Sequence, residues 1–594
     1  MRPSDECVFR AFDGTELFYR HWPATSGRSG GAIVLFHRGH EHSGRMAHLV
    51  DELGLDDFAF YAWDARGHGR SPGPRGFSPS VGTSVRDVDD FIADVAERSG
   101  HAVEDIAVIA QSVGAVLVSA WLHDYAPRIR CAVLAAPAFK VKLRVPFARS
   151  GLTLLHRLRG NFFLNSYVKA EFLTHDEKRV ASYDSDPLLS RPISVNILLS
   201  LDTIAERVVA DAQAVTVPVQ MLISGADRVV HLEPQHEFFE RLGSAVKEKH
   251  VLAGFYHDTL GERDREPVLA LVRDFIRARF AHPRDFVDLT GADKKGPTKE
   301  ETDRLAAPLP ALSPRAWYWA ATRLAMRLGG MLSSGIRLGH ETGFDSGSTL
   351  DYVYQNVARG RSALGRFIDR RYLNSIGWRG IRQRKVHIQE LIRDALQLLQ
   401  KAGAPIHVMD IAAGHGRYVL EALDAADVRP SSILLRDYSD RNVREGSALI
   451  QSKDLGHIAR FVKGDAFDRA SLAGVAPRPT LAIVSGLYEL FPDNEMVARS
   501  LAGVADAVPA GGYLIYTGQP WHPQLELIAR VLTSHRGGRA WIMRRRTQAE
   551  MDQLVRRAGF RKLSQRIDEW GIFTVSLAVR EEAPGAAPGG PTSS

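Results

Sequence analysis

Residues 106–118 read IAVIAQSVGAVLV and place Ser112 between an apolar run and a helical pattern. The run predicts a buried strand, and the residues after the serine predict a helix. A sharp turn between the two would expose the Ser112 hydroxyl above a sheet, as in the form G-x-S-x-G, with Ala110 here in place of the first glycine. Because such a pentapeptide also arises by chance, the prediction of a nucleophile depends on partners elsewhere in the chain.

Further short apolar runs surround this stretch in the first half of the chain. They cover residues 32–36, 58–63, 131–135, 219–223 and 250–252. Continuous apolar strands that alternate with helical patterns are typical of a parallel sheet with helices on both faces. The sequence therefore predicts an α/β fold for this half.

Two side chains downstream complete a candidate catalytic triad. Asp227 follows the apolar run VQMLI, and His257 lies in the segment GFYHDTLGE. Each alone could be an ordinary turn aspartate or loop histidine, but the order Ser, Asp, His is the one used on α/β-hydrolase sheets. In that arrangement Ser112 attacks an acyl carbonyl, His257 takes its proton, and Asp227 orients the imidazole.

Residues 1–280 resemble the monoacylglycerol lipase/lysophospholipase group of serine hydrolases. The motifs that carry the resemblance are HRGHEHSGR at 37–45, DARGHGRSPGPRG at 64–76 and SYDSDPLL at 182–189. The resemblance implies an α/β-hydrolase fold with a helical cap. It also implies hydrolysis of carboxylic esters of the acylglycerol or lysophospholipid type.

The same resemblance implies that the backbone N–H groups of Gly39 and Val113 form the oxyanion hole, where they would stabilise the developing alkoxide. One departure from the family pattern lies beside this loop, because Arg38 replaces a glycine. Two interpretations of Arg38 stay open. It could bind a phosphate-bearing substrate, or it could point to solvent.

Changes in composition suggest where the hydrolase half is interrupted and where it ends. Residues 138–201 lack convincing strands and read as a helical cap within a domain of residues 1–284. In the cap, residues 140–164 interleave basic and apolar side chains, which suits either contact with an anionic bilayer or packing on the core. Residues 285–314 are polar and proline-containing, so we expect an interdomain linker there.

A basic helical extension is predicted over residues 315–403. It holds 15 Lys or Arg residues against 6 Asp or Glu residues. Its aromatic residues alternate with Leu, Ile and Met at helical spacing, so they are expected to be core rather than a nucleic-acid platform. A cover over a substrate site or a membrane-facing surface fits this segment better.

A second strand–turn–helix pattern begins at residues 407–420, HVMDIAAGHGRYVL. Small residues in such a turn let a ligand approach the backbone, and the N–H groups that open the helix favour an anionic group. A dinucleotide fingerprint requires a third glycine, where this chain has Val419. NAD and FAD are therefore disfavoured.

Three acidic residues follow successive apolar strands in this half. They are Asp410, Asp437 and Asp465. Further strands are expected at 481–485 and 513–516, and a closing antiparallel hairpin at 561–566 and 572–579. Acids placed at the same end of neighbouring parallel strands are expected to converge on one ligand.

Residues 403–580 resemble the class I S-adenosylmethionine-dependent methyltransferases, which implies a Rossmann-like domain, placed at 404–581, and S-adenosyl-L-methionine as cofactor. The glycine motif of that family corresponds to Asp410–Gly416, with Ala412, Gly414 and Gly416 at its small-residue positions. The resemblance implies that Asp410 holds the methionine end, Asp437 the ribose hydroxyls and Asp465 the adenine amine.

Within that family, the chain looks closest to a bacterial group with a helical N-terminal extension. The shared segments are GFDSGSTLDYVY at 343–354 and GWRGIRQRK at 377–385. The substrate pocket of the family usually opens after the fourth strand. Candidates to line this acceptor pocket are Ser485, Tyr488 and Glu489, although Tyr488 and Glu489 could instead cap the next helix.

The overall composition limits the class of protein. The 594 residues are 45% hydrophobic and 24% charged, with a formal net charge of +7, so the chain is globular and basic. Only two cysteines are present, which excludes a disulfide framework and a cysteine-rich metal site. Neither an apolar signal segment nor an apolar run long enough to span a bilayer is evident. Residues 582–594 are expected to be disordered.

These observations predict a bifunctional enzyme, a serine ester hydrolase fused to a methyltransferase, with no metal required. We expect a small-molecule or lipid ester substrate and a cytoplasmic location, with peripheral contact on an anionic inner membrane face as one option. No nucleic-acid partner is expected, and nothing indicates an oligomeric state. Two alternatives remain. One is an enzyme pair acting on small soluble esters, and the other is that one half is a degenerate binding module.

Overall fold

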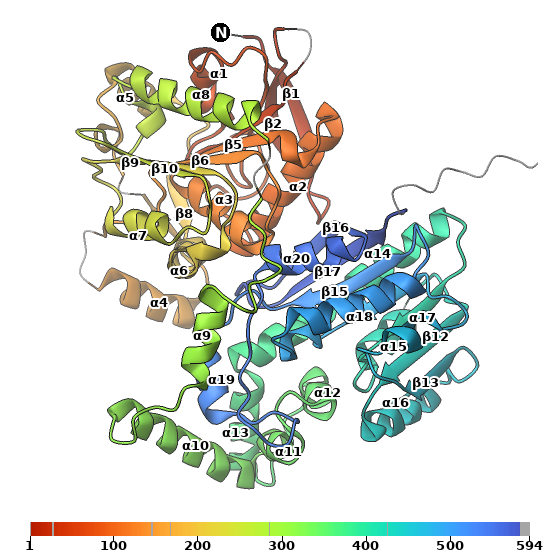
Figure 1. The fold of residues 1–594 in the computed structure, drawn as a ribbon. Helices are drawn as coiled ribbons and strands as arrows, with labels where there is room; N and C mark the ends of the chain where they lie inside the picture. The colour runs from red at the N-terminus through yellow and green to blue at the C-terminus, as the bar shows by residue number, and fades with distance from the viewer. Residues whose placement is uncertain are drawn as a thin grey trace, which may run out of the picture. The chain divides into compact units, whose positions relative to one another are not determined.

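The computed structural model describes residues 2–26, 29–143, 147–166, 168–283, 286–424 and 426–582. The predicted disordered tail lies almost wholly outside the described residues. The chain divides into two compact units, Met1–Val287 and Asp288–Ser594, drawn from red to green and from green to blue in Figure 1. No helix in the described residues has the length and hydropathy that a membrane span requires.

The first unit is built on an eight-stranded sheet in the order β1-β2-β4-β3-β5-β6-β9-β10. Its first two strands form an antiparallel hairpin, β2 pairs antiparallel with β4, and the other pairs are parallel. The strands are β1 (Asp5–Arg10), β2 (Glu16–Trp22), β3 (Ala32–Phe36), β4 (Ala59–Trp63), β5 (Ile106–Gln111), β6 (Cys131–Ala135), β9 (Val219–Ser224) and β10 (Lys247–Leu252).

Helices cover both faces of this sheet. On one face, alternate residues of β3 to β6 pack against α1 and α8, and on the other α2 and α3 lie against the central strands. The helices are α1 (His48–Glu52), α2 (Val81–Ser99), α3 (Val113–Asp124), α7 (Glu233–Arg241) and α8 (Glu266–Ala281). Fully buried parallel strands require this double cover, and the predicted α/β fold with an α/β-hydrolase first half is confirmed.

An insertion between β6 and β9 forms the cap. It contains α4 (Ala148–Arg159), β7 (Phe163–Asn165), α5 (Glu177–Ser185), β8 (Pro192–Ser194) and α6 (Val195–Ala210). The short β7 and β8 pair antiparallel, although we expected no strand in this segment. Three-residue strands carry too little alternation to be read from sequence.

The second unit contains a seven-stranded mixed sheet in the order β13-β12-β11-β14-β15-β17-β16. Its last two strands form the expected antiparallel hairpin, the first five are parallel to one another, and β15 pairs antiparallel with β17. The strands are β11 (His407–Asp410), β12 (Ser432–Asp437), β13 (Ala459–Lys463), β14 (Leu481–Val484), β15 (Tyr513–Gly518), β16 (Phe560–Ile567) and β17 (Thr574–Arg580).

Alternate strand residues of this sheet face two separate cores. One core packs against α14, α15 and α16, and the other against α17, α18 and α20. The helices of the sheet domain are α14 (Ile376–Lys401), α15 (Arg417–Asp424), α16 (Asp440–Ser452), α17 (Arg469–Ala473), α18 (Asn494–Ala507), α19 (Leu525–Val531) and α20 (Gln548–Arg557). Single-turn 3-10 helices cover Ser43–Met46, Val103–Asp105, Ala170–Phe172, Ala212–Ala214, Thr259–Gly261 and Tyr488–Leu490.

The helical extension packs on the same unit through a core of its own, which includes Trp319, Tyr352, Trp378 and Trp541. Its helices are α9 (Pro297–Ala306), α10 (Pro314–Leu332), α11 (Ser334–Thr342), α12 (Gly347–Gln355) and α13 (Ala363–Leu373). Most of its aromatic residues are thus core, although α10 leaves Trp317 and Tyr318 exposed.

The segment predicted as a linker is largely part of the second unit. Its helix α9 carries Thr298, which accepts a hydrogen bond from Arg544 at 3.1 Å, and Glu301, which pairs with Arg545 at 2.5 Å. Both arginines are buried. The polar composition of residues 288–306 therefore reflects ion pairs with distant residues rather than a free tether.

Candidate functional sites

Ser112 lies on a strained turn between β5 and α3. Its φ is +54° and its ψ is −116°, which a serine rarely adopts, and only 4% of the residue is exposed. Gly114 permits this turn, since a Cβ there would lie 2.5 Å from the carbonyl oxygen of His37. The local sequence therefore forms the strand-to-helix turn predicted from IAVIAQSVG.

The structure brings the three predicted triad side chains together. The Ser112 Oγ lies 2.7 Å from the His257 Nε2, and the Asp227 Oδ2 lies 2.7 Å from the His257 Nδ1. All three residues are buried. A hydroxyl, an imidazole and a carboxylate in series can transfer a proton away from the hydroxyl as it attacks.

Asp227 is held in its charged form. Burial opposes ionisation, but His257 and the N–H groups of Val229 and Val230 outweigh it, so the pKa of the Asp227 carboxyl is lowered. Those two N–H groups donate to Oδ1 at 2.7 and 2.9 Å. The carboxylate is thus fixed by backbone on one oxygen and faces His257 with the other.

The two residues expected to form the oxyanion hole lie close together. Gly39 lies on the loop after β3, and a Cβ built on it would be 3.1 Å from Cγ2 of Val113. Val113 directly follows Ser112 at the start of α3. The loop that carries Gly39 therefore packs against the residue that follows the serine.

Arg38 does not point to solvent, so that interpretation of it was wrong, and its charge already faces two carboxylates. The side chain is buried, donates to Glu41 Oε1 at 2.6 Å and lies 3.7 Å from Asp258 Oδ2. Asp258 directly follows His257 and also accepts from Gln111 at 3.1 Å. Arg38 therefore ties the oxyanion loop to the histidine loop.

The cap contacts the loop after β3 through the motifs that carry the family resemblance. His42 Nε2 lies 3.0 Å from Asp186 Oδ2, and Arg45 donates to Ser182 Oγ at 2.7 Å. The backbone N–H of Ser190 donates to the carbonyl of His40 at 3.0 Å. The cap is thus fixed at one end to the loop that carries Gly39.

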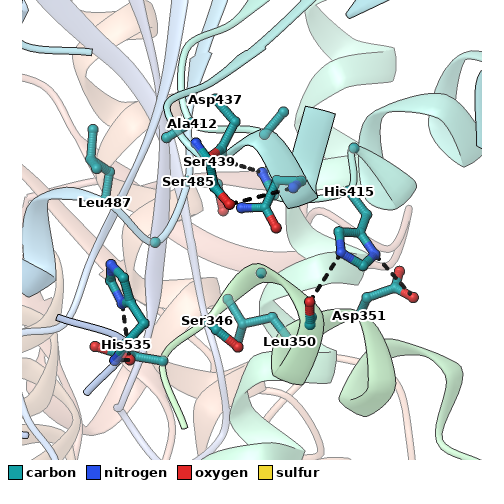
Figure 2. A pocket seen from close by; sticks show the side chains of 18 of the residues that line it. Ser346, Leu350, Asp351, Ala412, His415, Asp437, Ser439, Ser485, Leu487 and His535 are labelled. Atoms are coloured by element: carbon teal, nitrogen blue, oxygen red, sulfur yellow. Dashed lines mark hydrogen bonds and ion pairs between the residues drawn. The ribbon is translucent and has the colours of Figure 1, made fainter. Parts of the chain in front are cut away.

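A cavity of about 350 Å³ lies in the second unit at the carboxyl ends of β11, β12 and β14. Figure 2 shows Asp437, Ser439 and Ser485 of the sheet domain across from Ser346 and Leu350 of the extension. The carboxyl edge of a parallel sheet, where the strand order reverses, is a usual place for a ligand. This cavity is the candidate cofactor site and is called the cofactor cavity below.

The glycine turn and Asp437 form the sheet-side wall of the cofactor cavity. Gly414 and Gly416 have φ values of +58° and +73°, and a Cβ on Gly416 would lie 2.4 Å from Leu435. Asp437 Oδ2 accepts from the Gly414 N–H at 3.0 Å, and its Oδ1 accepts from the Ser439 N–H at 2.9 Å. Burial raises the pKa of the Asp437 carboxyl above its usual value.

Asp410 was predicted to hold the methionine end of the cofactor, but its side chain is fully buried beneath the turn. It accepts hydrogen bonds from the Tyr418 hydroxyl and, at 3.3 Å, from the Ala412 N–H. Ala412 and Tyr418 line the cofactor cavity and Asp410 does not. Asp410 therefore contributes to the site indirectly, because its hydrogen bonds fix the positions of Ala412 and Tyr418.

Burial raises the pKa of Asp410 to about 7, well above its ordinary 3.8, although the bonds from Tyr418 and Ala412 favour the charged form. The unfolded chain loses this proton near pH 4 and the folded chain only near pH 7, so stability falls between those values. We expect Asp410→Asn to stabilise the second unit at pH 8 by up to about 4 kcal/mol and to have little effect at pH 4.

Hydrogen exchange of amides in β11 and β14 measures the change in the free energy of unfolding that Asp410→Asn causes at pH 4 and at pH 8. The matched control is Asp465→Asn, at an exposed acid after the neighbouring strand. An equal effect of Asp410→Asn at both pH values would contradict the raised pKa.

Asp465 does not line the cofactor cavity. Its exposed carboxylate accepts from the Phe467 N–H at 2.9 Å, while its neighbours Gly464 and Ala466 form part of the wall. The predicted contact of the Asp465 side chain with adenine is therefore not supported. The β13 strand is in the expected place, but its turn directs the acid to solvent.

The three predicted acceptor residues lie in three different places. Ser485 lines the cofactor cavity, and Glu489 lines a second, adjoining cavity. Tyr488 is buried in the core behind them, where its hydroxyl donates to Ser500 Oγ at 3.0 Å. The helix that follows is capped by Asp493 rather than by Tyr488 or Glu489.

The extension contributes residues that sequence reasoning did not identify. Arg417 donates to Asp351 at 2.6 and 3.2 Å, and His415 Nδ1 lies 3.6 Å from the same carboxylate (Figure 2). Asp345 pairs with His535 at 3.0 Å on the same cavity. The segment GFDSGSTLDYVY, which marked the family, was the available signal because it supplies both aspartates.

The cofactor cavity fits S-adenosyl-L-methionine in its chemistry. Asp437 offers a carboxylate at the end of β12 for ribose hydroxyls, and the glycine turn lets a ligand approach the backbone. The Ser485 Oγ is buried without a hydrogen-bond partner. A buried hydroxyl of this kind is expected to bond to a ligand or to water.

Comparisons with known proteins assign the two halves to different families. The model of the family described as "Putative methyltransferase" matches residues 272–580, and that of the family "Serine aminopeptidase, S33" matches residues 27–264. The Escherichia coli (strain K12) protein "Uncharacterized protein YnbC" is 58% identical over 577 residues, which cover 97% of this chain and 98% of the relative.

Other relatives match the first half alone. A monoacylglycerol lipase of Mycolicibacterium smegmatis is 27% identical over 279 residues, covering 46% of this chain and 96% of the relative. The crystal structure of Paleococcus ferrophilus monoacylglycerol lipase is 26% identical with a TM-score of 0.41, covering 44% of this chain and 99% of the other. The family models and the lipase sequence confirm the predicted fusion of a hydrolase half and a methyltransferase half.

Proposed function

Because the chain belongs to the family described as "Putative methyltransferase" and also carries a serine hydrolase unit, we propose that it is a bifunctional enzyme. Its first unit hydrolyses carboxylic esters, and its second transfers a methyl group from S-adenosyl-L-methionine. The observation that carries the first activity is the Ser112–His257–Asp227 series with both distances at 2.7 Å.

In the proposed hydrolysis, Ser112 Oγ attacks the ester carbonyl carbon as His257 Nε2 takes the hydroxyl proton. Asp227 keeps His257 in the tautomer that presents Nε2 as acceptor and stabilises its charged form. His257 then protonates the leaving alcohol, and water releases the acid from Ser112 by the same route. Backbone N–H groups of Gly39 and Val113 would stabilise the oxyanion, which is typically worth about 3 kcal/mol per donor.

We propose an acylglycerol-type ester as substrate because a monoacylglycerol lipase matches this unit over 96% of its own length. A feature of the second unit supports a lipid setting as well. The helix α10 exposes Trp317, Tyr318, Leu324, Leu328 and Met331 beside the exposed arginines 323 and 327. Apolar and cationic side chains on one exposed helix suit the surface of an anionic bilayer.

In the proposed methyl transfer, the cofactor cavity holds S-adenosyl-L-methionine. Asp437 would bind the ribose hydroxyls, and the turn at Gly414 and Gly416 would contact the methionine end. When bound, the cofactor supplies an electrophilic methyl group. The Arg417–Asp351 pair keeps α12 of the extension over the cavity and would exclude water from it.

The test uses the intact chain with vesicles that contain 1-monooleoylglycerol, a total lipid extract and methyl-labelled S-adenosyl-L-methionine. We expect release of oleate and entry of label into a lipid, both faster on vesicles with anionic phosphatidylglycerol than on neutral phosphatidylcholine. Label in no lipid would restrict the methyl acceptor to water-soluble compounds, and absence of both reactions would contradict the proposal.

A further inference from the structure

A second cavity of about 360 Å³ adjoins the cofactor cavity in the second unit. It lies between the extension and the sheet domain, and most of its wall is hydrocarbon or aromatic. The apolar side chains that line it include Met326, Ile336, Ile368, Trp378, Ile528 and Trp541. A cavity of this size and lining is built to bury an apolar ligand.

The two cavities share part of their walls. Leu350, Arg384, Gly486 and Leu490 line both of them. A ligand in the second cavity can therefore reach the space where the transferred methyl group would lie. We call the second space the acceptor cavity.

Among the described residues, five side chains that line the acceptor cavity have a buried polar atom without a hydrogen-bond partner, and they are Tyr372, Arg384, Glu489, Gln519 and Trp541. Only the Glu489 atom among them is a pure acceptor, and the donor nearest to it in sequence is on Gln519, which directly follows β15. Glu489 is 8% exposed, and its Oε1 accepts from Thr517 at 2.7 Å while its Oε2 has no partner. Gln519 is 5% exposed, and its Nε2 donor also has no partner. Leaving such buried groups unpaired is unfavourable, so they are expected to meet a ligand or water.

We propose that the acceptor cavity binds an alcohol with a long apolar body and places its hydroxyl between Glu489 Oε2 and Gln519 Nε2. This inference rests on the proposed methyl transfer and names the class of acceptor. A hydroxyl donates one hydrogen bond and accepts others, so it satisfies both orphan groups at once. The apolar body fills the hydrocarbon part of the cavity.

Other polar groups match the pair less well. A carboxylate would bring a second negative charge to Glu489, whose own charge already faces Arg384 at 3.9 Å and interacts with Arg546. An ammonium group has no acceptor for the Gln519 N–H. An alcohol leaves the Arg384–Glu489 pair as it is.

In the reaction the alcohol oxygen forms a bond to the methyl carbon while the bond from that carbon to the donor sulfur breaks, with its electron pair left on sulfur. The hydroxyl proton passes to Glu489 Oε2. The products are a methyl ether, S-adenosylhomocysteine and a protonated Glu489, which returns its proton to water. Glu489 is thus the catalytic base of this step.

Titration calorimetry of decan-1-ol and of 1-methoxydecane tests the assignment without turnover. The ether has the same apolar body but no proton to donate, so we expect wild type to bind the alcohol at least about tenfold more tightly. Glu489→Gln is expected to bring the two affinities within about twofold. Ile368→Trp, which fills the cavity, should weaken both ligands at least about tenfold, while Phe367→Trp at an exposed site on the same helix should change neither.

S-adenosyl-L-methionine is titrated into each of the same samples. Retained cofactor binding with no binding of decan-1-ol would overturn the acceptor assignment alone. Equal affinities of wild type for the alcohol and the ether would overturn the role of Glu489. Failure of all variants and wild type to bind the cofactor would instead overturn the proposed methyl transfer.

Discussion

Ser112→Ala is expected to lower the kcat for ester hydrolysis by about 10⁶-fold, as loss of the nucleophile does in other triad enzymes. The Ser112 Oγ is the atom that His257 Nε2 contacts at 2.7 Å, and no other hydroxyl takes that place on the strained turn. Release of oleate from 1-monooleoylglycerol measures the effect. Labelling of the chain by a fluorophosphonate probe should be lost in parallel.

Ser119→Ala is the matched control for this prediction. Ser119 is a buried serine on the same helix, α3, and its hydroxyl donates to the carbonyl of Ala115 at 2.7 Å. We expect it to retain hydrolysis and labelling within about threefold of wild type. If the Ser112→Ala variant hydrolyses the ester at a rate comparable to that of wild type, the nucleophile lies elsewhere.

Asp437→Ala is expected to weaken binding of S-adenosyl-L-methionine by about 100-fold. The carboxylate would accept two charge-assisted hydrogen bonds from the ribose, and a loss near 3 kcal/mol corresponds to that factor. The substitution also removes the acceptor of the Gly414 N–H, which orders the glycine turn. Calorimetry of the intact chain measures the affinity, and ester hydrolysis should stay unchanged.

Asp440→Ala provides the control three residues away. Its carboxylate is exposed and pairs with Lys463 at 2.9 Å, outside the cofactor cavity. We expect its affinity for the cofactor to stay within about twofold of wild type. Equal affinities of Asp437→Ala and wild type would remove Asp437 from the site and require another placement of the cofactor.

The central strands of both sheets could be predicted from sequence because they are continuous apolar runs. The run at 32–36 is β3, and the runs at 131–135 and 219–223 correspond to β6 and β9. A strand that is buried on both faces has apolar residues at successive positions, so it is recognisable as a continuous apolar run in the sequence. The N-terminal strands β1 and β2 were not predicted, because several of their residues are exposed and polar.

The residues brought together at the hydrolase site could also be predicted, because the order of the triad follows from the order of the strands. The environment of Arg38 could not be predicted. Its partners are Glu41 and Asp258, and the latter lies about 220 residues away. From sequence alone, an arginine next to a catalytic loop suggests substrate binding, because the carboxylates that pair with it in the fold are not known.

The site in the second unit was predicted less completely, because the direction of its acidic side chains depends on hydrogen bonds that the motifs do not show. The strand ends correctly located Asp437, but hydrogen bonds to Tyr418 and to Phe467 turned Asp410 and Asp465 away from the cavity. The wall formed by α12 depends on the contact of Asp351 with Arg417. The bonds to Asp410 and Asp465 come from residues only eight and two positions further on, but a motif does not show which way a turn directs its acid. The Asp351–Arg417 contact joins segments 66 residues apart, and no local pattern predicts it.

The central claim is that one chain carries two working sites, and native mass spectrometry of the intact protein tests it most directly. The sample contains the chain with a fluorophosphonate and S-adenosyl-L-methionine together. We predict a species that carries one covalent phosphonate at Ser112 and one bound cofactor. A protein that never takes up one of the two, under conditions where it stays folded, would contradict the account.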